Sequence, residues 1–559
     1  MLDMTDAVRP LSAVRSSRQL RIGAVIAVAI AIGAAMRLWA FGGGRALWLD
    51  EAMVVLNLLN IPVLDLSGTL GFHQIAPTGW LLFQKAAHMV WPDVEFSQRA
   101  PALIGGLAAL AAFAALARRV LPIGAAGLAI LLFAVSPTLI RYSAEAKPYI
   151  FDVLTASLIL YCAYVALNDP ARRTRATLAL AATGAVAAFF TIGGLMVAAT
   201  TGVVLFAASV VRGDRAWSLA LAAVGAVWAA AVGAQYFMAY ADYYATVGAE
   251  AYDSYWGNAF APAPLSADAV AWYARTAHTL IGAIHNGLGT DQPLKLVYSG
   301  LLAVALAAGG VVLVRSDRWL FALLAAPVVM SVLAALLQVY PMTPRLQLAL
   351  APSVLVTAAA GVSLASRSAG RRSYLVLAAA AIVLAAGPLA IAMERALKQP
   401  PFAHQEVRPL LAHIAAERGP DALLMTTRQS RPALLIYAQE YDLAGMRYAV
   451  GHKTRGRPDC ALRDAALVSP EREAWILISH EADSDVAGNN LLRGELERRG
   501  SVTLAMEAAG SRLYRYAADT SYRTPDFVGV PGVDRCPTTV PVAGIEPPIA
   551  ARAGIARIN

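Results

Sequence analysis

A series of apolar runs divides this chain, and most of the runs are about 20 residues long. A helix of about 20 residues spans the ~30 Å hydrocarbon core of a membrane. By that length the sequence predicts a polytopic α-helical membrane protein with about eleven transmembrane helices. These spans lie near residues 22–41, 101–117, 121–140, 150–167, 176–192, 195–211, 216–238, 293–314, 319–339, 345–365 and 373–393. A mean hydropathy of +0.55 agrees, because a soluble enzyme is far less apolar.

The first run, residues 22–41, follows a basic N-terminal segment, as the apolar part of a signal peptide would. A signal peptide is usually shorter and ends at a small-residue cleavage site. Here Arg37, Trp39 and Phe41 follow the Ala-rich part of the run. We therefore predict an uncleaved first helix.

The uncharged run 176–211 is either one long helix or two short ones. A single helix would be roughly 54 Å long, nearly twice the thickness of the hydrocarbon core. We therefore predict two helices, with Gly193 and Gly194 marking a tight turn between them.

The basic residues of the short loops are distributed unevenly. Twelve arginines fall on one side of the predicted topology: Arg118, Arg119, Arg172, Arg173, Arg175, Arg212, Arg215, Arg315, Arg318, Arg367, Arg371 and Arg372. The short loops of the other side hold only Arg141, Lys147 and Arg345. The positive-inside rule places the twelve and the N-terminus in the cytoplasm, which predicts a bacterial inner-membrane protein with its C-terminus in the periplasm. Because the net charge of +9 follows this loop pattern, we expect no nucleic-acid partner.

The predicted organisation has three parts: a cytoplasmic segment (1–21), a transmembrane domain (22–395) with long outer loops at 42–100 and 239–292, and a periplasmic domain (396–559). The second outer loop and the helix end before it are rich in aromatic rings that suit a membrane interface, so we expect interfacial helices there. These rings belong to Tyr236, Tyr240, Tyr243, Tyr244, Tyr252, Tyr255 and Trp256.

After residue 396 the apolar runs shorten to strand length and charged residues return. We predict a small soluble α/β domain from this alternation. Its helices are expected at 405–418, 430–441 and 486–499, and its strands at 421–427, 474–480 and 511–517. Cys460 and Cys536 both lie in it, and outside the cytoplasm they are expected either to form a disulfide or to remain two free thiols.

Two adjacent carboxylates, Asp50 and Glu51, follow the first span. Acidic side chains at a helix start interact favourably with the helix dipole, which is a purely structural explanation. Ionisable residues at the rim of a membrane bundle are nevertheless costly unless they are used. One of these carboxylates can serve as the general base that deprotonates an acceptor hydroxyl, or the pair can hold a divalent cation.

The segment Arg141-Tyr142-Ser143-Ala144-Glu145-Ala146-Lys147-Pro148-Tyr149 places two cations on the side that has few. Arg and Lys are the residues that bind phosphate. The spacing equally allows Glu145 to neutralise Arg141 and Lys147 in a structural ion-pair cluster.

Two further outer loops hold isolated candidates. Arg345 follows two prolines in Tyr340-Pro-Met-Thr-Pro-Arg345 and is a second candidate for binding phosphate. His73 lies in Phe72-His-Gln-Ile-Ala-Pro77, where an ordinary surface histidine is the alternative to a site residue.

Taken in order, the Asp-Glu pair, the His-x-x-x-Pro segment, the Tyr-Ser-x-Glu-x-Lys-Pro-Tyr loop and the late Pro-x-Arg loop resemble the GT-C glycosyltransferases. More narrowly, the chain is similar to the family 39 and protein-mannosyltransferase-like group that includes the lipid A aminoarabinose transferases. The similarity covers roughly residues 20–395. Lys147 departs from it, since relatives more often have Arg, and His-Gln-Ile-Ala-Pro departs where many have a His-Pro-Pro run.

The resemblance implies an enzyme that transfers a sugar from a polyprenyl-phosphate carrier to a glycan, lipid or protein at the outer membrane surface. Asp50 then matches the essential acid, with Glu51 beside it, and Lys147 and Arg345, helped by Arg141, match the cations near the carrier phosphate. The substrate contacts expected from the same motifs are His73, Tyr142, Glu145 and Tyr149. The reaction itself requires no cofactor, and a divalent cation at Asp50 and Glu51 is the one optional addition.

Two other classes of function fit a chain with eleven spans. A secondary transporter is expected to show internal repeats and polar or Gly/Pro-interrupted segments near the midplane, whereas the polar clusters here lie at the rim. A non-enzymatic assembly protein would account for the soluble domain but not for the outward-facing cations.

Overall fold

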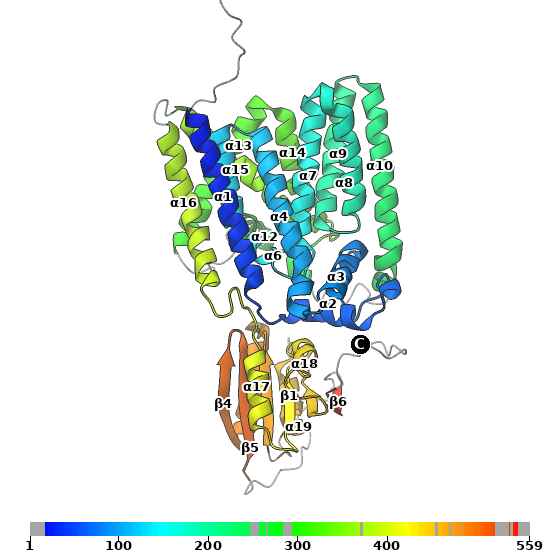
Figure 1. The fold of residues 1–559 in the computed structure, drawn as a ribbon, viewed down its shortest axis with the longest axis vertical. Helices are drawn as coiled ribbons and strands as arrows, with labels where there is room; N and C mark the ends of the chain where they lie inside the picture. The colour runs from blue at the N-terminus through cyan, green and yellow to red at the C-terminus, as the bar shows by residue number, and fades with distance from the viewer. Residues whose placement is uncertain are drawn as a thin grey trace, which may run out of the picture.

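The computed structural model has two parts, a helical bundle and an α/β domain at one end of it (Figure 1). The structure describes residues 17–245, 256–263, 266–282, 293–368, 373–452, 457–468, 471, 473–481, 483–519, 536 and 540–545. Most of the predicted N-terminal segment therefore lies outside the described residues, as do Tyr252 and Tyr255. We call the end of the bundle next to the α/β domain the domain side, and the opposite end the far side.

Every predicted span falls on a helix of the bundle. These helices are α1 (Ser17–Gly42), α4 (Val94–Val120), α5 (Ile123–Val135), α7 (Tyr149–Asn168), α8 (Arg173–Ala187), α9 (Gly193–Val211), α10 (Arg215–Gln235), α13 (Pro293–Ser316), α14 (Arg318–Leu336), α15 (Ala351–Ser368) and α16 (Ser373–Ala396). Among the described residues, 8 helices are long and apolar enough to cross a membrane, and two shorter apolar helices join them. The protein is therefore a multi-pass membrane protein.

The predicted break in run 176–211 is present, because α8 ends at Ala187 and α9 begins at Gly193. The turn lies just before the two glycines, which form the first turn of α9 instead of the loop. A Cβ added at Gly194 would lie 2.8 Å from Thr191 Oγ1, and one added at Gly193 would lie 3.2 Å from Asp152 Cγ. Small residues at these two positions therefore allow α9 to pack closely against α7.

Ion pairs and hydrogen bonds connect the basic loops of the far side. Arg119 lies 3.1 Å from Asp169, and Arg173 lies 2.9 Å from Asp214. Arg212 donates a 2.7 Å hydrogen bond to the Leu167 carbonyl oxygen. Three loops that the sequence analysis placed on one side are therefore neighbours in the fold.

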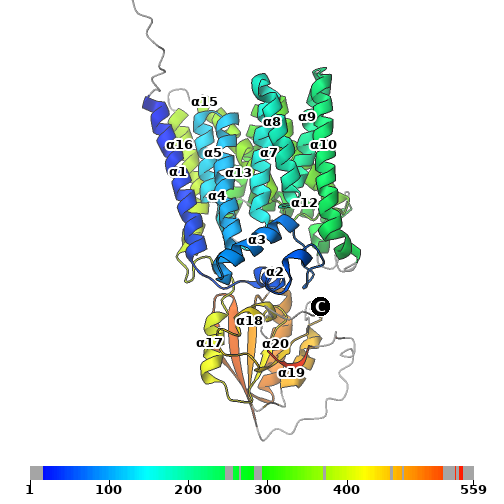
Figure 2. The ribbon, with the colours of Figure 1, turned by 45° about the vertical axis from the view of Figure 1, so that its right-hand side comes forward.

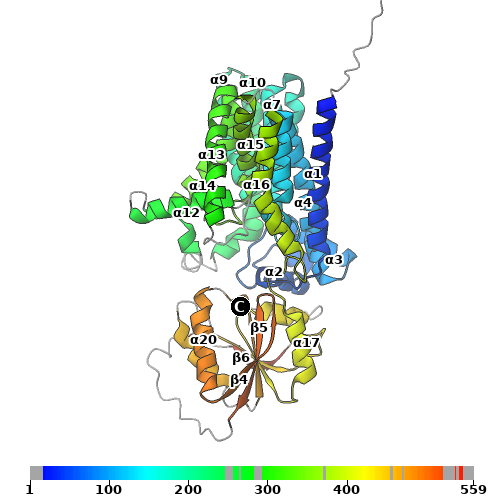
Figure 3. The same ribbon diagram turned by 90° about the vertical axis from the view of Figure 1, so that its left-hand side faces the viewer.

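Short helices lie across the domain side of the bundle, and Figure 2 shows α2 and α3 between the spans and the α/β domain. The short helices of the bundle are α2 (Leu49–Asn60), η1 (Val63–Asp65), α3 (Thr78–Val90), α6 (Pro137–Tyr142), η2 (Pro170–Arg172), η3 (Tyr236–Tyr240), η4 (Gly257–Ala259), α12 (Ala267–Gly282) and η5 (Leu348–Leu350). In Figure 3, α12 runs across the direction of the spans, in the segment expected to hold interfacial helices. Its Trp272 is buried while its Val270 is exposed, as in a helix lying on a surface.

The α/β domain contains a six-stranded sheet in the order β4-β5-β3-β1-β2-β6. Its elements are α17 (Arg408–Glu417), β1 (Leu423–Thr426), α18 (Arg431–Tyr437), β2 (Arg447–Val450), η7 (Pro458–Cys460), α19 (Ala461–Val468), β3 (Glu473–Ser479), α20 (Asp483–Glu497), β4 (Gly500–Ala508), β5 (Ser511–Ala518) and β6 (Val540–Gly544). Strand β1 pairs in parallel with β2 and β3, with Leu423 opposite Ala474, and the three outer pairings are antiparallel. Helices α17 and α20 cover opposite faces of the sheet (Figure 3).

All three predicted strands and all three predicted helices of this domain are present, as β1, β3, β5, α17, α18 and α20. Strand β1 is fully buried, since it lies centrally in the sheet. One continuous apolar cluster joins the domain to the bundle, because Leu47 and Val55 of the first outer segment pack with Leu411 and Tyr437 of the domain. The domain is therefore packed onto the segment that holds Asp50.

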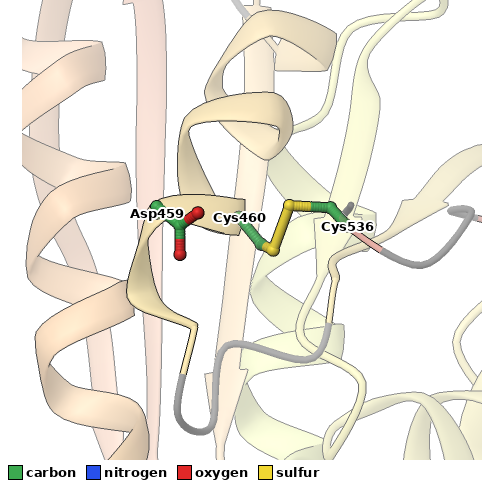
Figure 4. A group of neighbouring side chains, drawn as sticks. All are labelled: Asp459, Cys460 and Cys536. Carbon is green, nitrogen blue, oxygen red and sulfur yellow. A yellow bond between two sulfur atoms is a disulfide. The ribbon is translucent and has the colours of Figure 1, made fainter. Parts of the chain in front are cut away.

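A disulfide joins Cys460 and Cys536, whose Cα atoms lie 5.7 Å apart (Figure 4). It links η7 to a residue 76 positions further along the chain. Asp459 lies beside the two sulfur atoms (Figure 4). Because both sulfur atoms are bonded to each other, they are not available as thiolate ligands for a metal.

Candidate active site

An ion pair at the domain side joins two residues that lie 295 positions apart in the sequence. Arg345 Nη1 lies 2.5 Å from Asp50 Oδ2. Asp50 is in the first turn of α2, where the helix dipole favours a negative charge, and Arg345 precedes η5. Their side chains are 14% and 20% exposed, so both are accessible while being largely removed from water.

Lys147 is the second cation near Asp50. It is buried, and its Nζ donates a 2.9 Å hydrogen bond to Gln74 Oε1. Burial lowers the pKa of Lys147 below its ordinary value of 10.5, although the nearby charge of Asp50 opposes this shift. For Asp50, burial would raise the pKa, but Lys147 and Arg345 outweigh it and hold the pKa below 3.8. Asp50 is therefore an ionised carboxylate at neutral pH.

Aromatic rings surround Arg345. Its guanidinium carbon lies 5.9 Å from the centre of the Tyr149 ring and 5.3 Å from that of Trp256. Tyr142 meets Tyr149 edge to face, with ring centres 5.3 Å apart. The structure thus brings Tyr149 to Arg345 and Tyr142 to Tyr149, so both predicted tyrosines lie near the ion pair.

Glu51, the neighbour of Asp50, has a different environment. It is completely buried, and its two carboxylate oxygens accept 2.8 and 2.6 Å hydrogen bonds from Arg99. The backbone N–H groups of Trp48 and Ala146 donate to the same carboxylate. Arg99 holds the pKa of Glu51 below 4.5 against the opposing effect of burial. This is the geometry of a structural ion pair, so of the two predicted carboxylates Asp50 is the accessible one.

Arg141 and Glu145 form the ion pair that the sequence analysis considered as a structural alternative. Arg141 Nε lies 2.8 Å from Glu145 Oε2, and the Arg141 guanidinium also covers the Trp48 ring at 5.3 Å. Burial raises the pKa of Glu145, although Arg141 opposes that shift. Arg45 bonds to the carbonyl oxygen of Ala144. Arg141 therefore stabilises the loop that presents Lys147.

His73 is exposed, with a positive φ of 52°. Its neighbour Gln74 is the residue of this loop that reaches the site, by bonding to Lys147. Gln74 also donates to the carbonyl oxygen of Phe72 at 3.3 Å. In this loop the contact with the site is therefore made by the amide and not by the imidazole.

The α/β domain binds the segment that leads into α2. Three backbone N–H groups donate to its side chains: Ala46 to Glu406 at 3.1 Å, Leu47 to the Tyr437 hydroxyl at 2.8 Å, and Leu49 to Gln405 at 2.9 Å. Backbone N–H groups at a helix start have no partner within the helix, so bonds of this kind fix the helix end. The domain thereby fixes the position of the turn that carries Asp50.

The predicted metal site at Asp50 and Glu51 does not fit this geometry. Both oxygens of Glu51 are bonded to Arg99, and Asp50 is paired with Arg345. The two carboxylates therefore cannot hold one cation together unless a buried ion pair is broken, which is strongly unfavourable.

Several residues that build the site were not among the predicted site residues. They are Arg45, Gln74, Arg99, Trp256, Gln405, Glu406 and Tyr437. A signal existed for Arg99, because a lone arginine next to an apolar run requires a partner. The domain residues carried no comparable signal, since their partners lie more than 300 positions away.

No family model matches the chain, and no curated protein matches it. Among solved structures it is similar to ArnT from Cupriavidus metallidurans in the apo state, with a TM-score of 0.52 and 12% identity over 89% of this chain and 98% of the other. The undecaprenyl phosphate complex of that protein gives a TM-score of 0.51 and 14% identity over the same shares.

The chain is also similar to the archaeal oligosaccharyltransferase AglB from Archaeoglobus fulgidus, in complex with an inhibitory peptide and a dolichol-phosphate. This match has a TM-score of 0.52 and 11% identity, over 90% of this chain and 75% of the other. All three structures are of GT-C glycosyltransferases, so the chain has the GT-C fold that its motifs resemble.

Proposed function

We propose that this GT-C-fold protein is an inverting glycosyltransferase that moves a sugar from a polyprenyl monophosphate to an acceptor hydroxyl. One observation carries the proposal: an accessible carboxylate, Asp50, lies beside two cations, Arg345 and Lys147, at one end of a membrane bundle. The solved structures of similar fold contain undecaprenyl phosphate in one case and a dolichol-phosphate in another. The lipid part of such a carrier stays in the bilayer, so its phosphate lies at the membrane surface. That is the height of the domain side of the bundle, where Asp50 lies.

Arg345 and Lys147 are the proposed donor-phosphate ligands. The guanidinium of Arg345 offers a planar fork that matches a phosphate, and the ammonium of Lys147 supplies a second positive charge. An incoming phosphate competes with Asp50 for Arg345. Donor binding then weakens the 2.5 Å ion pair and leaves the carboxylate free to act as a base.

In the proposed reaction, the acceptor oxygen attacks the anomeric carbon on the face opposite the phosphate. The new carbon–oxygen bond forms as the bond to the phosphate oxygen breaks, and the proton of the acceptor hydroxyl passes to Asp50. The carrier leaves as a polyprenyl phosphate with one additional negative charge. Arg345 and Lys147 stabilise that developing charge where little water is present.

We place the domain side of the bundle in the periplasm of a bacterial inner membrane. The arginine-rich loops of the far side support this orientation, because basic loops stay in the cytoplasm. The disulfide between Cys460 and Cys536 supports it as well, since disulfides persist in oxidising compartments.

The test is polyprenyl phosphate release from a panel of labelled polyprenyl-phosphate sugars by the protein in lipid, with membrane extract as acceptor. Asp50→Asn should lower the release rate by about 10²- to 10⁴-fold, the usual contribution of a general base. Asp65→Asn, at an exposed carboxylate of η1, is the matched control and should keep the wild-type rate.

Full turnover by Asp50→Asn would remove Asp50 from the mechanism. If the folded wild-type protein released no carrier from any donor, a transport or assembly function would be favoured instead.

A further inference from the structure

The carboxyl ends of strands β1 and β3 face the candidate active site. Gln405 bridges the two parts, since its Oε1 accepts from Leu49 N at 2.9 Å and its Nε2 donates to Ser479 Oγ at 2.8 Å. Ser479 ends β3, and its backbone N–H bonds at 2.8 Å to Ser430, which follows β1. In open α/β sheets, ligands bind beyond the carboxyl ends of the strands, where the strand order reverses. That reversal lies here between β1 and β3.

His480, the first residue after β3, extends from this edge towards the bundle. Its imidazole centre lies 5.3 Å from that of Trp48, the residue that precedes α2. The charge of His480 is also among those that lower the pKa of Asp50. His480 has a φ of 53°, a left-handed conformation that is strained for a non-glycine residue and is typical of functional sites. A 3.0 Å bond from its backbone N–H to the Gly510 carbonyl oxygen supports this conformation.

Three buried polar atoms around Trp48 have no hydrogen-bond partner in the described part of the chain. They are Trp48 Nε1, His404 Nε2 and Glu145 Oε1. The side chains that carry them belong to one cluster, because His404 contacts the Trp48 ring and Arg141 joins that ring to Glu145. Buried polar atoms without partners are unfavourable, and the hydroxyl groups of a sugar can supply both donors and acceptors.

The charges of this region oppose a cationic ligand. The charged side chains that act on Asp50 are all cations, namely Lys147, Arg345 and His480. One phosphate diester does not balance this excess of cations. The carboxylate next to His480 in sequence, Glu481, is paired with Arg512 at 3.2 Å. A sugar with a charged amino group would therefore meet net repulsion.

We propose that the carboxyl edge of β1 and β3 forms the outer wall of the subsite for the donor sugar, with His480 as the contacting residue, and that this sugar carries no cationic amino group. The inference rests on the proposed function. A sugar attached directly to a phosphate bound by Arg345 and Lys147 lies next to Asp50, between the bundle and His480. The α/β domain then takes part in substrate recognition.

The experiment measures equilibrium binding at pH 7 by the full-length protein in lipid nanodiscs. The ligands are undecaprenyl phosphate, its glucose, galactose and mannose conjugates, and its 4-amino-4-deoxyarabinose conjugate. The main variant is His480→Gly, because glycine adopts a φ of 53° without strain and the variant should fold at least as well as the wild type. Glu481→Gln changes the adjacent surface residue and is the matched control.

We expect His480→Gly to weaken binding of the preferred uncharged conjugate by about fivefold, the loss of one hydrogen bond. Undecaprenyl phosphate should bind the variant as it binds the wild type, and Glu481→Gln should change neither affinity. The wild type should bind at least one uncharged conjugate about tenfold more tightly than the amino-sugar conjugate, because repulsion of about 1.4 kcal/mol produces that ratio.

The inference is overturned if His480→Gly weakens undecaprenyl phosphate and the conjugates equally, if it weakens none of them, or if the amino-sugar conjugate binds best. Failure of the wild type to bind undecaprenyl phosphate is a separate outcome. That result would contradict the proposed function itself, and the inference with it.

Discussion

Lys147 shows how burial adjusts the chemistry of a single residue. The ammonium is buried and bonded to Gln74, and its pKa lies below the ordinary 10.5. A lysine must be protonated to attract a phosphate. The proposed donor site therefore loses the charge of Lys147, though not that of Arg345, at a lower pH than it would with an exposed lysine.

Replacing Lys147 by arginine should change the pH dependence of carrier release. In the wild type, kcat/KM should fall on the alkaline side at a pH below 10.5, as Lys147 deprotonates. Lys147→Arg should remove that fall, because a guanidinium stays charged at high pH. Lys85→Arg is the matched control, since Lys85 is a partly buried lysine that bonds to a backbone carbonyl of Ile61. An unchanged alkaline limb in Lys147→Arg would contradict this role.

The pair of Glu51 and Arg99 predicts a stability effect. Glu51→Gln leaves the buried Arg99 unpaired and should destabilise the protein by about 3–5 kcal/mol, measured as a loss of thermal stability in detergent. Changing both residues, in Glu51→Gln/Arg99→Met, should recover part of that loss. Glu417→Gln, at an exposed position of α17, should have almost no effect. If Glu51→Gln were as stable as the wild type, the pair would not hold the loops together.

The same pair predicts a pH effect with a definite sign. The folded-state pKa of Glu51 lies below its ordinary value of 4.5. Its contribution to stability is therefore fully present above pH 4.5 and disappears as the pH falls through the folded-state pKa. Wild-type thermal stability should drop below pH 4.5 by more than that of Glu51→Gln, and equal drops would exclude Glu51 as the cause.

At the scale of elements, helix α4 and the loop that presents Lys147 pack unusually closely. A Cβ added at Gly106 would lie 2.2 Å from Ser143 Oγ and 3.2 Å from Ser143 Cα. Ser143 is buried and bonds to the Leu139 carbonyl oxygen at 2.6 Å, so it has little freedom to move. The position of Lys147 relative to Asp50 thus depends on residue 106 being a glycine, which has no side chain.

Gly106→Ala should displace this loop, destabilise the protein by about 1–3 kcal/mol and lower the rate of carrier release. Gly225→Ala is the matched control, because a Cβ there meets nothing within 4 Å in helix α10. That variant should be slightly more stable than the wild type, since alanine favours a helix by up to about 1 kcal/mol over glycine. Equal stability and activity of the two variants would show that the loop accommodates the added methyl group.

The spans were predictable because a hydrophobic run of membrane length has few alternatives, and the structure confirms a helix at each of them. The central strands β1 and β3 were predictable for a similar reason, since each contains a short run of consecutive apolar residues, 423–425 in β1 and 474–478 in β3. Strand β2 begins with the exposed Arg447, β6 contains Pro541 and Gly544, which disfavour a strand, and β4 is an edge strand in which no residue is buried.

The site was predictable only in part. Asp50, Lys147 and Arg345, which the structure brings together, could be predicted because cations and acids at the rim of a bundle are rare. Asp50 and Glu51 could not be told apart from the sequence, since their environments differ through partners distant in the chain: Arg345 for Asp50, and Arg99, 48 positions away, for Glu51. His480 and Gln405 lie near the site only because the α/β domain packs onto the bundle, and no local sequence pattern predicts that packing.

At the scale of the whole molecule, the disulfide closes a loop of 76 residues within the α/β domain. A closed loop of this length stabilises a domain by about 4 kcal/mol, because it restricts the unfolded chain. Cys460→Ser/Cys536→Ser should therefore lower thermal stability, and a reducing agent should do the same to the wild type. Cys162→Ser is the control, and it should respond to the reducing agent as the wild type does. No change on reduction would contradict this contribution.

The three hydrogen bonds between the domain and the segment before Asp50 also determine when, during synthesis of the chain, this segment becomes fixed. Ala46, Leu47 and Leu49 are synthesised early, while their partners Glu406, Tyr437 and Gln405 emerge from the ribosome some 360 to 390 residues later. Until then the turn that carries Asp50 lacks these anchors, even though both cations of the donor site are already in the membrane. A truncated chain that ends before residue 396 would thus hold Asp50, Lys147 and Arg345 but not their alignment, and the proposed transfer reaction would begin only when synthesis is nearly complete.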